Sequence, residues 1–369
     1  MKEANIQAFI RREDRTLHLK DGDSRFISKD EFADWFSTLE QQSIDFKPRK
    51  PRLIHFLYEA GAFFLENKVR EQKYYAVDTE FESVQTASIS QQTLELFAKN
   101  HPSFEEYENS YQQVQFHLHE GNAYQINLTF PFQFDLKTTV EPSSYNTFMG
   151  SSKAASFAQS IYWPKQNITF LSNSPETLFT ARLKQNGQWR VSSKPIKGTA
   201  NTGEWEKLKD SKKDQAELLM ITDLVKNDLN FLSGGNAVVD HLKERLDVPG
   251  LVHQFSEVST EVPGSTSVGK LMRSLFPGGS ITGAPKKRVC ELIDEIEEKP
   301  RGFYCGSTLF WDGSGLSASI NIRSGVIDWS KQSATLHAGG GVTVHSDCES
   351  EWNEMLSKLK SFQNVLTTI

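Results

Sequence analysis

The chain has 369 residues, of which 37% are hydrophobic and 24% are charged, so it can bury a sizeable core and is not expected to be disordered. Its formal charge is −6, from 41 basic and 47 acidic residues. This charge argues against a nucleic-acid partner, which calls for a basic excess or a basic stripe.

The sequence has neither an apolar run of membrane-spanning length nor an apolar signal region at its start. Its three cysteines, Cys290, Cys305 and Cys348, form no disulfide framework and no metal-binding spacing. We therefore expect a cytoplasmic protein with no membrane partner.

The first hundred residues read as a mixed accessory region. Apolar side chains at helical spacing predict a helix over residues 31–41, with Ser28 as a possible cap. Residues 53–64 are apolar and aromatic and are expected to be buried. Because no chemical motif occurs here, we assign residues 1–105 to an N-terminal accessory region that contributes to the same sandwich as the rest.

The middle of the chain begins with a capping box, Ser103 to Glu106, which predicts a helix to about His119. Residues 123–134 alternate and are rich in strand formers, so they predict one strand, or two strands divided at Pro131. Shorter strands are expected over residues 160–163, 168–172 and 189–193. Short strands followed by helices favour an α+β domain with a large, mostly antiparallel sheet.

Lys197 lies in the stretch from Pro195 to Thr199, after a short strand predicted over residues 191–194. We therefore expect Lys197 just past a strand end, with Gly198 allowing the backbone to approach a ligand or another strand closely. A partly desolvated lysine can attack carbon. The alternative is a solvated lysine in a turn.

A helix is expected from about residue 211 to 229, and Glu217 falls on its apolar stripe, one turn before Ile221. A carboxylate there is costly unless a cation or a hydrogen-bond donor meets it. It is either a ligand-binding group or half of a buried ion pair.

The last helix is expected from about Asp347 to Leu366. Glu351, Glu354 and Lys358 lie together on a stripe beside its apolar face. Two carboxylates could bind a hard cation such as Mg²⁺, and the lysine could meet an anionic ligand. The alternative is an ordinary solvated face with a Glu–Lys pair.

Two further features precede that helix. Gly339, Gly340 and Gly341 stand before a strand-like segment, which suggests a ligand lying against bare backbone. Arg323, at the end of an alternating strand, could clamp a carboxylate. A structural ion pair is its alternative role.

Taken together, these stretches resemble the chorismate-utilising enzymes. The matching pieces occur in family order: residues 121–129, 174–176, 195–199, 213–217, 223–229, 277–286, 301–306, 322–324 and 339–358. The resemblance implies two stacked, mostly antiparallel sheets flanked by helices. It also implies that residues 106–369 form the chorismate-binding catalytic domain.

The resemblance also implies roles for individual residues. Glu217 and Glu354 match the Mg²⁺ ligands, with Glu351 acting through water, and the metal would hold one carboxylate of chorismate. Glu176 matches the acid/base group beside the departing 4-hydroxyl. The groups around the other carboxylate and the rest of the substrate site match Tyr304, Arg323, Lys358, His253, Gly198 and the amides of Gly339 and Gly341.

Two positions select a branch of the family. The branches that add water carry a lysine where this chain has Gln125, and the anthranilate-forming branch carries alanine where this chain has Lys197. The resemblance is thus to the branch that makes 4-amino-4-deoxychorismate from chorismate and ammonia for folate synthesis, with Lys197 as the nucleophile at C2. An anthranilate-forming enzyme and a non-catalytic subunit are the alternatives.

Nitrogen supply is the last expectation. A glutamine amidotransferase needs an activated cysteine, and none of the three cysteines lies in a Gly-x-Cys-x-Gly elbow. We therefore expect a separate glutamine amidotransferase subunit to supply ammonia.

Overall fold

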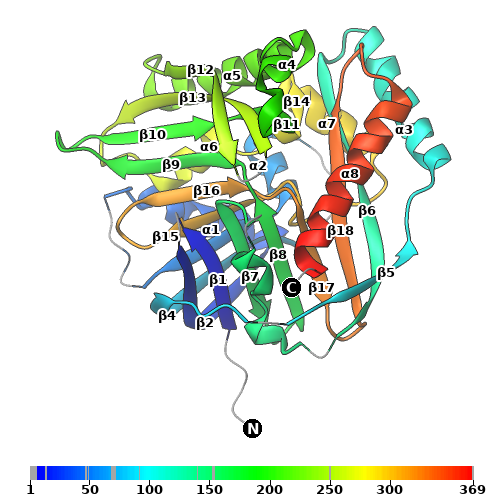
Figure 1. Ribbon diagram of the computed structural model, residues 1–369. Coiled ribbons are helices and arrows are strands. Elements are labelled where there is room, and N and C mark those ends of the chain that lie inside the picture. Colours follow the sequence, from blue (N-terminus) through cyan, green and yellow to red (C-terminus); the bar gives the residue numbers. More distant parts are fainter. Residues whose placement is uncertain are drawn as a thin grey trace.

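The computed structural model describes residues 6–12, 15–45, 48, 50–67, 72–90, 92–138, 140–151, 154–248 and 251–367. Within these residues the strands pair into one continuous 18-stranded sheet, and every ladder is antiparallel. Helices lie on the outside, as Figure 1 shows. The predicted α+β class with a large antiparallel sheet is confirmed.

One half of the sheet begins with β13, which pairs with β10, β11 and β12, and continues through β9, β16, β15, β3 and β4 to β2. The bounds of these strands are β2 Arg15–Ser28, β3 Arg52–Phe56, β4 Tyr74–Thr86, β9 Thr177–Leu183, β10 Trp189–Lys194, β11 Ile196–Asn201, β12 Val238–Val248, β13 Leu251–Val262, β15 Ser307–Trp311 and β16 Leu316–Ile320.

The other half runs from β1 through β7, β8, β17 and β18 to β6, which also pairs with β5 and β14. The hairpin of β1 and β2 joins the halves. The bounds here are β1 Ile6–Arg12, β5 Glu95–Asn100, β6 Gln125–Lys137, β7 Phe157–Trp163, β8 Ile168–Ser174, β14 Gly283–Ala284, β17 Ser324–Asp328 and β18 Ser333–Val342.

The longer helices begin where the sequence provides caps. Ser28 and Ser103 each form a complete capping box, at the starts of α1 and α3. Both predicted helix starts are confirmed. The helices are α1 Lys29–Gln41, α2 Gly61–Leu65, α3 Phe104–His119, α4 Trp205–Lys209, α5 Lys212–Ser233, α6 Val268–Leu275, α7 Lys286–Ile296 and α8 Cys348–Thr367.

The helices cover the sheet where the site residues lie. Helix α5 packs on β13 and β11, and α8 packs on β18. One buried apolar cluster contains side chains from both halves of the sheet, such as Phe179 and Leu309 from one and Phe132 and Leu336 from the other. The two halves therefore share a core.

The strand predicted over residues 123–134 is one strand, β6. Pro131 lies inside it opposite His337 of β18 and does not divide it. In the described part of the chain, no helix is long and apolar enough to cross a membrane.

Candidate functional site

Lys197 stands just past the end of β10, as predicted, but it also lies inside the next strand, β11, and not in a turn. Pro195 separates β10 from β11, but β11 resumes pairing with β13, and Lys197 stands opposite Gln254. The register shifts between Lys197 and Thr199, and Gly198 at this bulge has φ +72°. A Cβ at Gly198 would lie 2.6 Å from Leu208 Cδ1, so both conformation and space require glycine.

The bulge directs the Lys197 side chain toward α5. Its Nζ lies 3.8 Å from Glu217 Oε2, and the two side chains are only 19% and 16% exposed. Burial raises the pKa of Glu217, while Lys197 and Lys213 act in the opposite direction. Glu217 on the apolar stripe is thus matched by lysines, as the ion-pair alternative required.

Helix α8 brings two more carboxylates to the same place. Glu351 is buried and accepts hydrogen bonds from Ser346 Oγ, at 2.7 Å, and from Lys213 Nζ of α5, at 3.3 Å. Glu354 Oε1 lies 2.7 Å from Lys358 Nζ. Burial opposes ionisation of Glu354, but Lys358 together with Lys213 and Lys197 outweighs it, and the pKa of Glu354 is lowered.

These carboxylates are candidate ligands for a metal ion. Among the described residues, no three His, Cys, Asp or Glu side chains gather closely enough to form a metal cluster as they stand. Glu217, Glu351 and Glu354 are instead each near a lysine. Their oxygen donors fit a hard cation such as Mg²⁺. Gly340 leaves space beside them, because even an added Cβ would stay 3.4 Å from Glu351 Oε2.

Glu176 lies between β8 and β9, buried at the centre of the predicted residues. Burial raises the pKa of its carboxyl, and Ser280, Lys197, Lys358 and Arg323 lower it in part. Because electrostatic interactions weaken with distance, these effects on the pKa mean that the three cations lie near the Glu176 carboxyl. Glu176 is therefore suited to hold a proton within a cationic pocket.

Arg323 stands immediately before β17 with φ +47°, an uncommon conformation for a residue with a side chain. Burial lowers the pKa of its guanidinium, and Glu176 acts in the opposite direction. His253 on β13 lies near it, with Nδ1 3.3 Å from the carbonyl oxygen of Gly198. Arg323 therefore supplies positive charge to the site, and His253 lies beside it.

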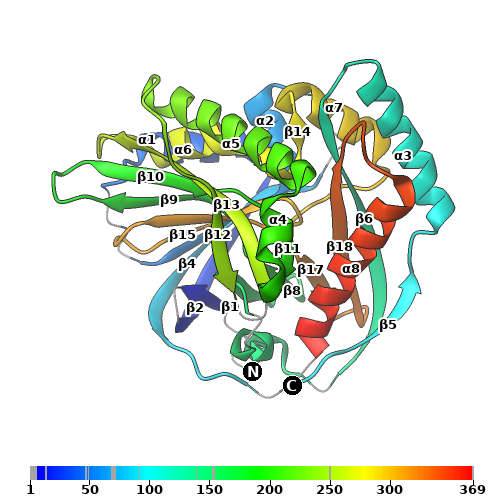
Figure 2. The same cartoon turned by 45° about the horizontal axis from the view of Figure 1, so that its top comes forward.

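Gly339 and Gly341 lie within β18. The prediction that the glycines stand before a strand is therefore wrong. They pair with Thr129 and Asn127 of β6. Lys358 Nζ donates to the carbonyl oxygen of Gly339 at 3.2 Å, which ties α8 to this strand. Figure 2 shows α8 beside β18 and, across from them, β11 and α4.

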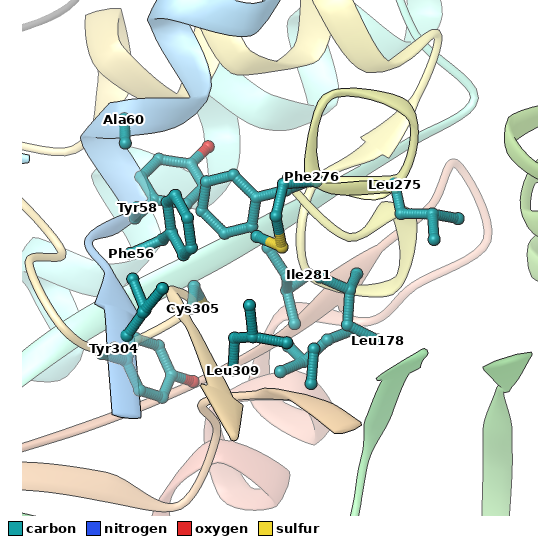
Figure 3. Close-up of a cluster of buried hydrophobic side chains, with 14 of the residues drawn as sticks. Phe56, Tyr58, Ala60, Leu178, Leu275, Phe276, Ile281, Tyr304, Cys305 and Leu309 are labelled. Atoms are coloured by element: carbon teal, nitrogen blue, oxygen red, sulfur yellow. The ribbon is translucent and has the colours of Figure 1, made fainter. Parts of the chain in front are cut away.

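Tyr304 is buried in a turn that follows α7, and its ring stacks on His337 at 5.1 Å between centroids. Burial raises the pKa of its hydroxyl well above the usual value. Figure 3 shows Tyr304 and Cys305 within the apolar cluster that contains Phe56 and Leu309.

The turn that carries Tyr304 is held by a buried ion pair, which the sequence analysis did not single out. Arg301 donates to both oxygens of Glu297, at 2.9 and 2.7 Å. A carboxylate from the N-terminal region, Glu59, also holds this turn, because it accepts hydrogen bonds from the backbone N–H groups of Arg301 and Gly302. The i,i+4 spacing of Glu297 and Arg301 was the available signal.

Lys213 was missed as a residue of the site, and the burial of Gln125 was not expected. Lys213 meets Glu351, and its position one turn before Glu217 could have revealed it. Gln125 is fully buried with both amide atoms lacking a partner among the described residues, and it faces Gly341, whose added Cβ would lie 2.4 Å from Nε2. A glutamine in a strand gives no sequence signal of this burial.

A cavity of about 560 Å³ lies away from these residues, between β1, β7, β9, β15 and β16. None of the predicted site residues lines it. It is separate from the cluster around Lys197.

Residues 31–364 match the model of a family described as chorismate binding enzyme. Aminodeoxychorismate synthase component 1 of Salmonella typhimurium is 34% identical over 264 residues, which cover 69% of this chain and 56% of that protein. The chain thus spans little more than half the length of that relative. An uncharacterized PabA-like protein of Haemophilus influenzae is 27% identical over 331 residues, covering 86% of this chain and 90% of that protein.

The fold is also that of a solved relative. Anthranilate synthase component I from Streptococcus pneumoniae aligns with a TM-score of 0.74 at 17% identity, covering 98% of this chain and 93% of that one. The family match covers most of the chain, and the fold agrees with it. The chain belongs to the chorismate-binding enzyme family.

Proposed function

We propose that this chain makes 4-amino-4-deoxychorismate from chorismate and ammonia. The observation that carries the proposal is Lys197, a largely buried amine on a strand bulge, between Glu217 and Glu176. The relative from Salmonella typhimurium bears the name of that activity.

The reaction is proposed in two displacements. The neutral Lys197 amine attacks C2 of chorismate while Glu176 gives its proton to the departing 4-hydroxyl, which leaves as water. Ammonia then attacks C4, the bond from C2 to Lys197 breaks, and the electron pair returns to the lysine nitrogen. Glu176 takes the extra proton from the new amine and is restored.

The other residues bind and orient chorismate in this proposal. Arg323, Tyr304 and Lys358, with the amides of Gly339 and Gly341, receive one carboxylate, and His253 contributes to the rest of the substrate site. Glu217, Glu354 and, through water, Glu351 would hold Mg²⁺, which when bound supplies positive charge for the other carboxylate. Gly198 has no side chain, so the backbone beside Lys197 can lie close to the substrate.

We also propose that ammonia comes from a separate glutamine amidotransferase subunit. Burial raises the pKa of Cys290 to about 11 and that of Cys305 to about 12, and burial also raises the pKa of Cys348. A nucleophilic cysteine has a lowered pKa. The purified chain should therefore use ammonium salts but not glutamine, and glutamine hydrolysis by the chain alone would contradict this.

The test is product analysis with chorismate, Mg²⁺ and ammonium, comparing wild type with Lys197→Ala. Lys194→Ala is the matched control, because Lys194 is on the preceding strand and pairs with Glu257 at 3.0 Å. Wild type and Lys194→Ala should form the 4-amino product. Lys197→Ala should lose it while still binding chorismate, and residual amination should shift to C2.

Two more results decide the role of Lys197. Lys197→Arg should not restore activity, since a guanidinium stays protonated. When ammonia is withheld, the mass of the protein should rise by that of chorismate less water, at Lys197. Normal 4-amino product from Lys197→Ala would refute the covalent role, amination by wild type at C2 alone would indicate an anthranilate-forming enzyme, and binding without turnover would indicate a non-catalytic subunit.

A further inference from the structure

A small cavity lies directly beside Glu176. Its walls come from α5, from the loop after α6 and from the strand ends around Pro195 and Ile320. It holds about 10 Å³ of space for the centre of a water-sized molecule, which is room for one such molecule. Two of its apolar walls, Leu178 and Leu275, are labelled in Figure 3.

One polar wall of this cavity is Ser280. The residue is 8% exposed, and its hydroxyl makes no hydrogen bond to any described residue. The hydroxyl points toward the Glu176 carboxyl as a hydrogen-bond donor and lowers the pKa of that group, but its geometry falls short of a formed hydrogen bond. A buried hydroxyl without a partner is costly, so a small molecule bonded to Ser280 and Glu176 would remove a real penalty.

Two of the other polar walls, Ser193 and Asp228, already have partners. Ser193 Oγ donates to the carbonyl oxygen of Thr177 at 3.3 Å, and Asp228 pairs with Lys286 of α7 at 2.7 Å. The side chains of Asp228 and Lys286 are 17% and 11% exposed, so the cavity lies one side chain from the surface. Ser280 is thus the polar group of the wall that a guest molecule would satisfy.

The other walls decide what kind of guest fits. Ile221, Val225, Leu178 and Leu275 are apolar, and the Asp228 carboxylate is already paired with Lys286, so a neutral guest loses less hydration free energy than an ammonium ion. Ammonia and water are both neutral and of the right size. Two N–H groups of ammonia can donate to Ser280 Oγ and to the Glu176 carboxylate, which leaves the nitrogen lone pair free.

We propose that this cavity is a binding site for one small, neutral, hydrogen-bonding molecule, and that it holds ammonia beside Glu176 before the second displacement. The ammonia assignment rests on the proposed function, in which the nucleophile enters at C4, the carbon whose hydroxyl Glu176 protonates. Glu176 faces both the cavity and the cations Lys197, Lys358 and Arg323. It is therefore the boundary between the waiting site and the substrate site.

The test is the dependence of the rate on ammonium and on chorismate separately, in wild type and Ser280→Ala. The matched control is Ser274→Ala on α6, since Ser274 is equally buried, at 7% exposure, and its hydroxyl donates to the carbonyl oxygen of Lys270 in the same helix. Ser280→Thr is a second variant, which keeps the hydroxyl and adds a methyl group to the cavity.

For Ser280→Ala we expect KM for ammonium to rise about tenfold, the effect of losing about 1.4 kcal/mol of hydrogen bonding. KM for chorismate should stay within about twofold, and Ser274→Ala should change neither. Ser280→Thr should also raise KM for ammonium, because the methyl group occupies the site.

Other results would overturn the inference. If wild type makes the 4-amino product and both Ser280 variants keep its KM for ammonium, the cavity holds only a structural water. If KM for chorismate rises as much as KM for ammonium, Ser280 acts on substrate binding and not on ammonia. Wild type that aminates no chorismate would refute the proposed function and the ammonia assignment together.

Discussion

Replacing each of the three consecutive glycines of β18 by alanine should give three different results. None of them has a positive φ, so the backbone accepts alanine at each and only space decides. An alanine Cβ at Gly339 would lie 2.3 Å from the carbonyl oxygen of Leu128, at Gly341 2.4 Å from Gln125 Nε2, and at Gly340 no closer than 3.4 Å to any atom.

The magnitudes follow from what each added methyl group meets. Gly340→Ala should be stabilised by about 0.4–1 kcal/mol, because alanine restricts the unfolded chain. Gly339→Ala should be destabilised by at least the 1–3 kcal/mol typical of overpacking, since the paired backbone of β6 cannot move aside. Gly341→Ala should lie between them, because Gln125 is a side chain but is fully buried.

The assay is urea unfolding of the three variants beside wild type, together with turnover of chorismate. The expected order of stability is Gly340→Ala, then Gly341→Ala, then Gly339→Ala. Gly340→Ala should fold well and yet lose activity, since its methyl group lies beside Glu351 and 3.6 Å from Lys358 Nζ. Equal stability of Gly339→Ala and Gly340→Ala would refute the reasoning.

Two other predictions concern metal and pH. Glu354→Gln should bind Mg²⁺ more weakly by calorimetry, by at least the roughly tenfold that losing a supporting group costs, whereas Glu349→Gln, exposed on the same helix, should not; unchanged Mg²⁺ affinity in Glu354→Gln would remove it from the metal site. Burial lowers the pKa of His55 to about 3, below its unfolded value of 6.5, so the unfolded state binds the proton first and stability falls as pH falls below about 6.5. Between pH 6.5 and 5.0 this side chain should cost wild type about 1.6 kcal/mol of unfolding free energy, because the slope reaches about 1.4 kcal/mol per pH unit only well below pH 6.5. His55→Gln should escape this loss, whereas His241→Gln, on the surface, should not. The same pH dependence in His55→Gln would contradict the assignment.

Features with local causes could be predicted from the sequence. The helix starts at Ser28 and Ser103 depend on hydrogen bonds within four residues, and both were found. The class of the fold followed from short strands interrupted by helices. The placement of Glu217 on one helix stripe, and the grouping of Glu351, Glu354 and Lys358 on another, could also be read from spacing.

Features that depend on distant pairing could not be predicted. Lys197 is in a strand because β13, more than fifty residues later in the chain, pairs with it. The glycines of β18 are in a strand because β6 pairs with them. The burial of Gln125 and the cavity at Ser280 depend on how α5, α7 and the sheet meet, and no single segment encodes that.

The pairing of β3 with both β4 and β15 has a consequence for how this family can evolve. Ladder hydrogen bonds join backbone to backbone, so they constrain strand direction and register but not the identity of each side chain. The sequence can change greatly while the pairing of strands persists. The Streptococcus pneumoniae structure illustrates this, because it covers 98% of this chain at 17% identity. The N-terminal strands cannot be exchanged as a module, however, because removing β3 would leave β15 an unpaired edge in the middle of the sheet.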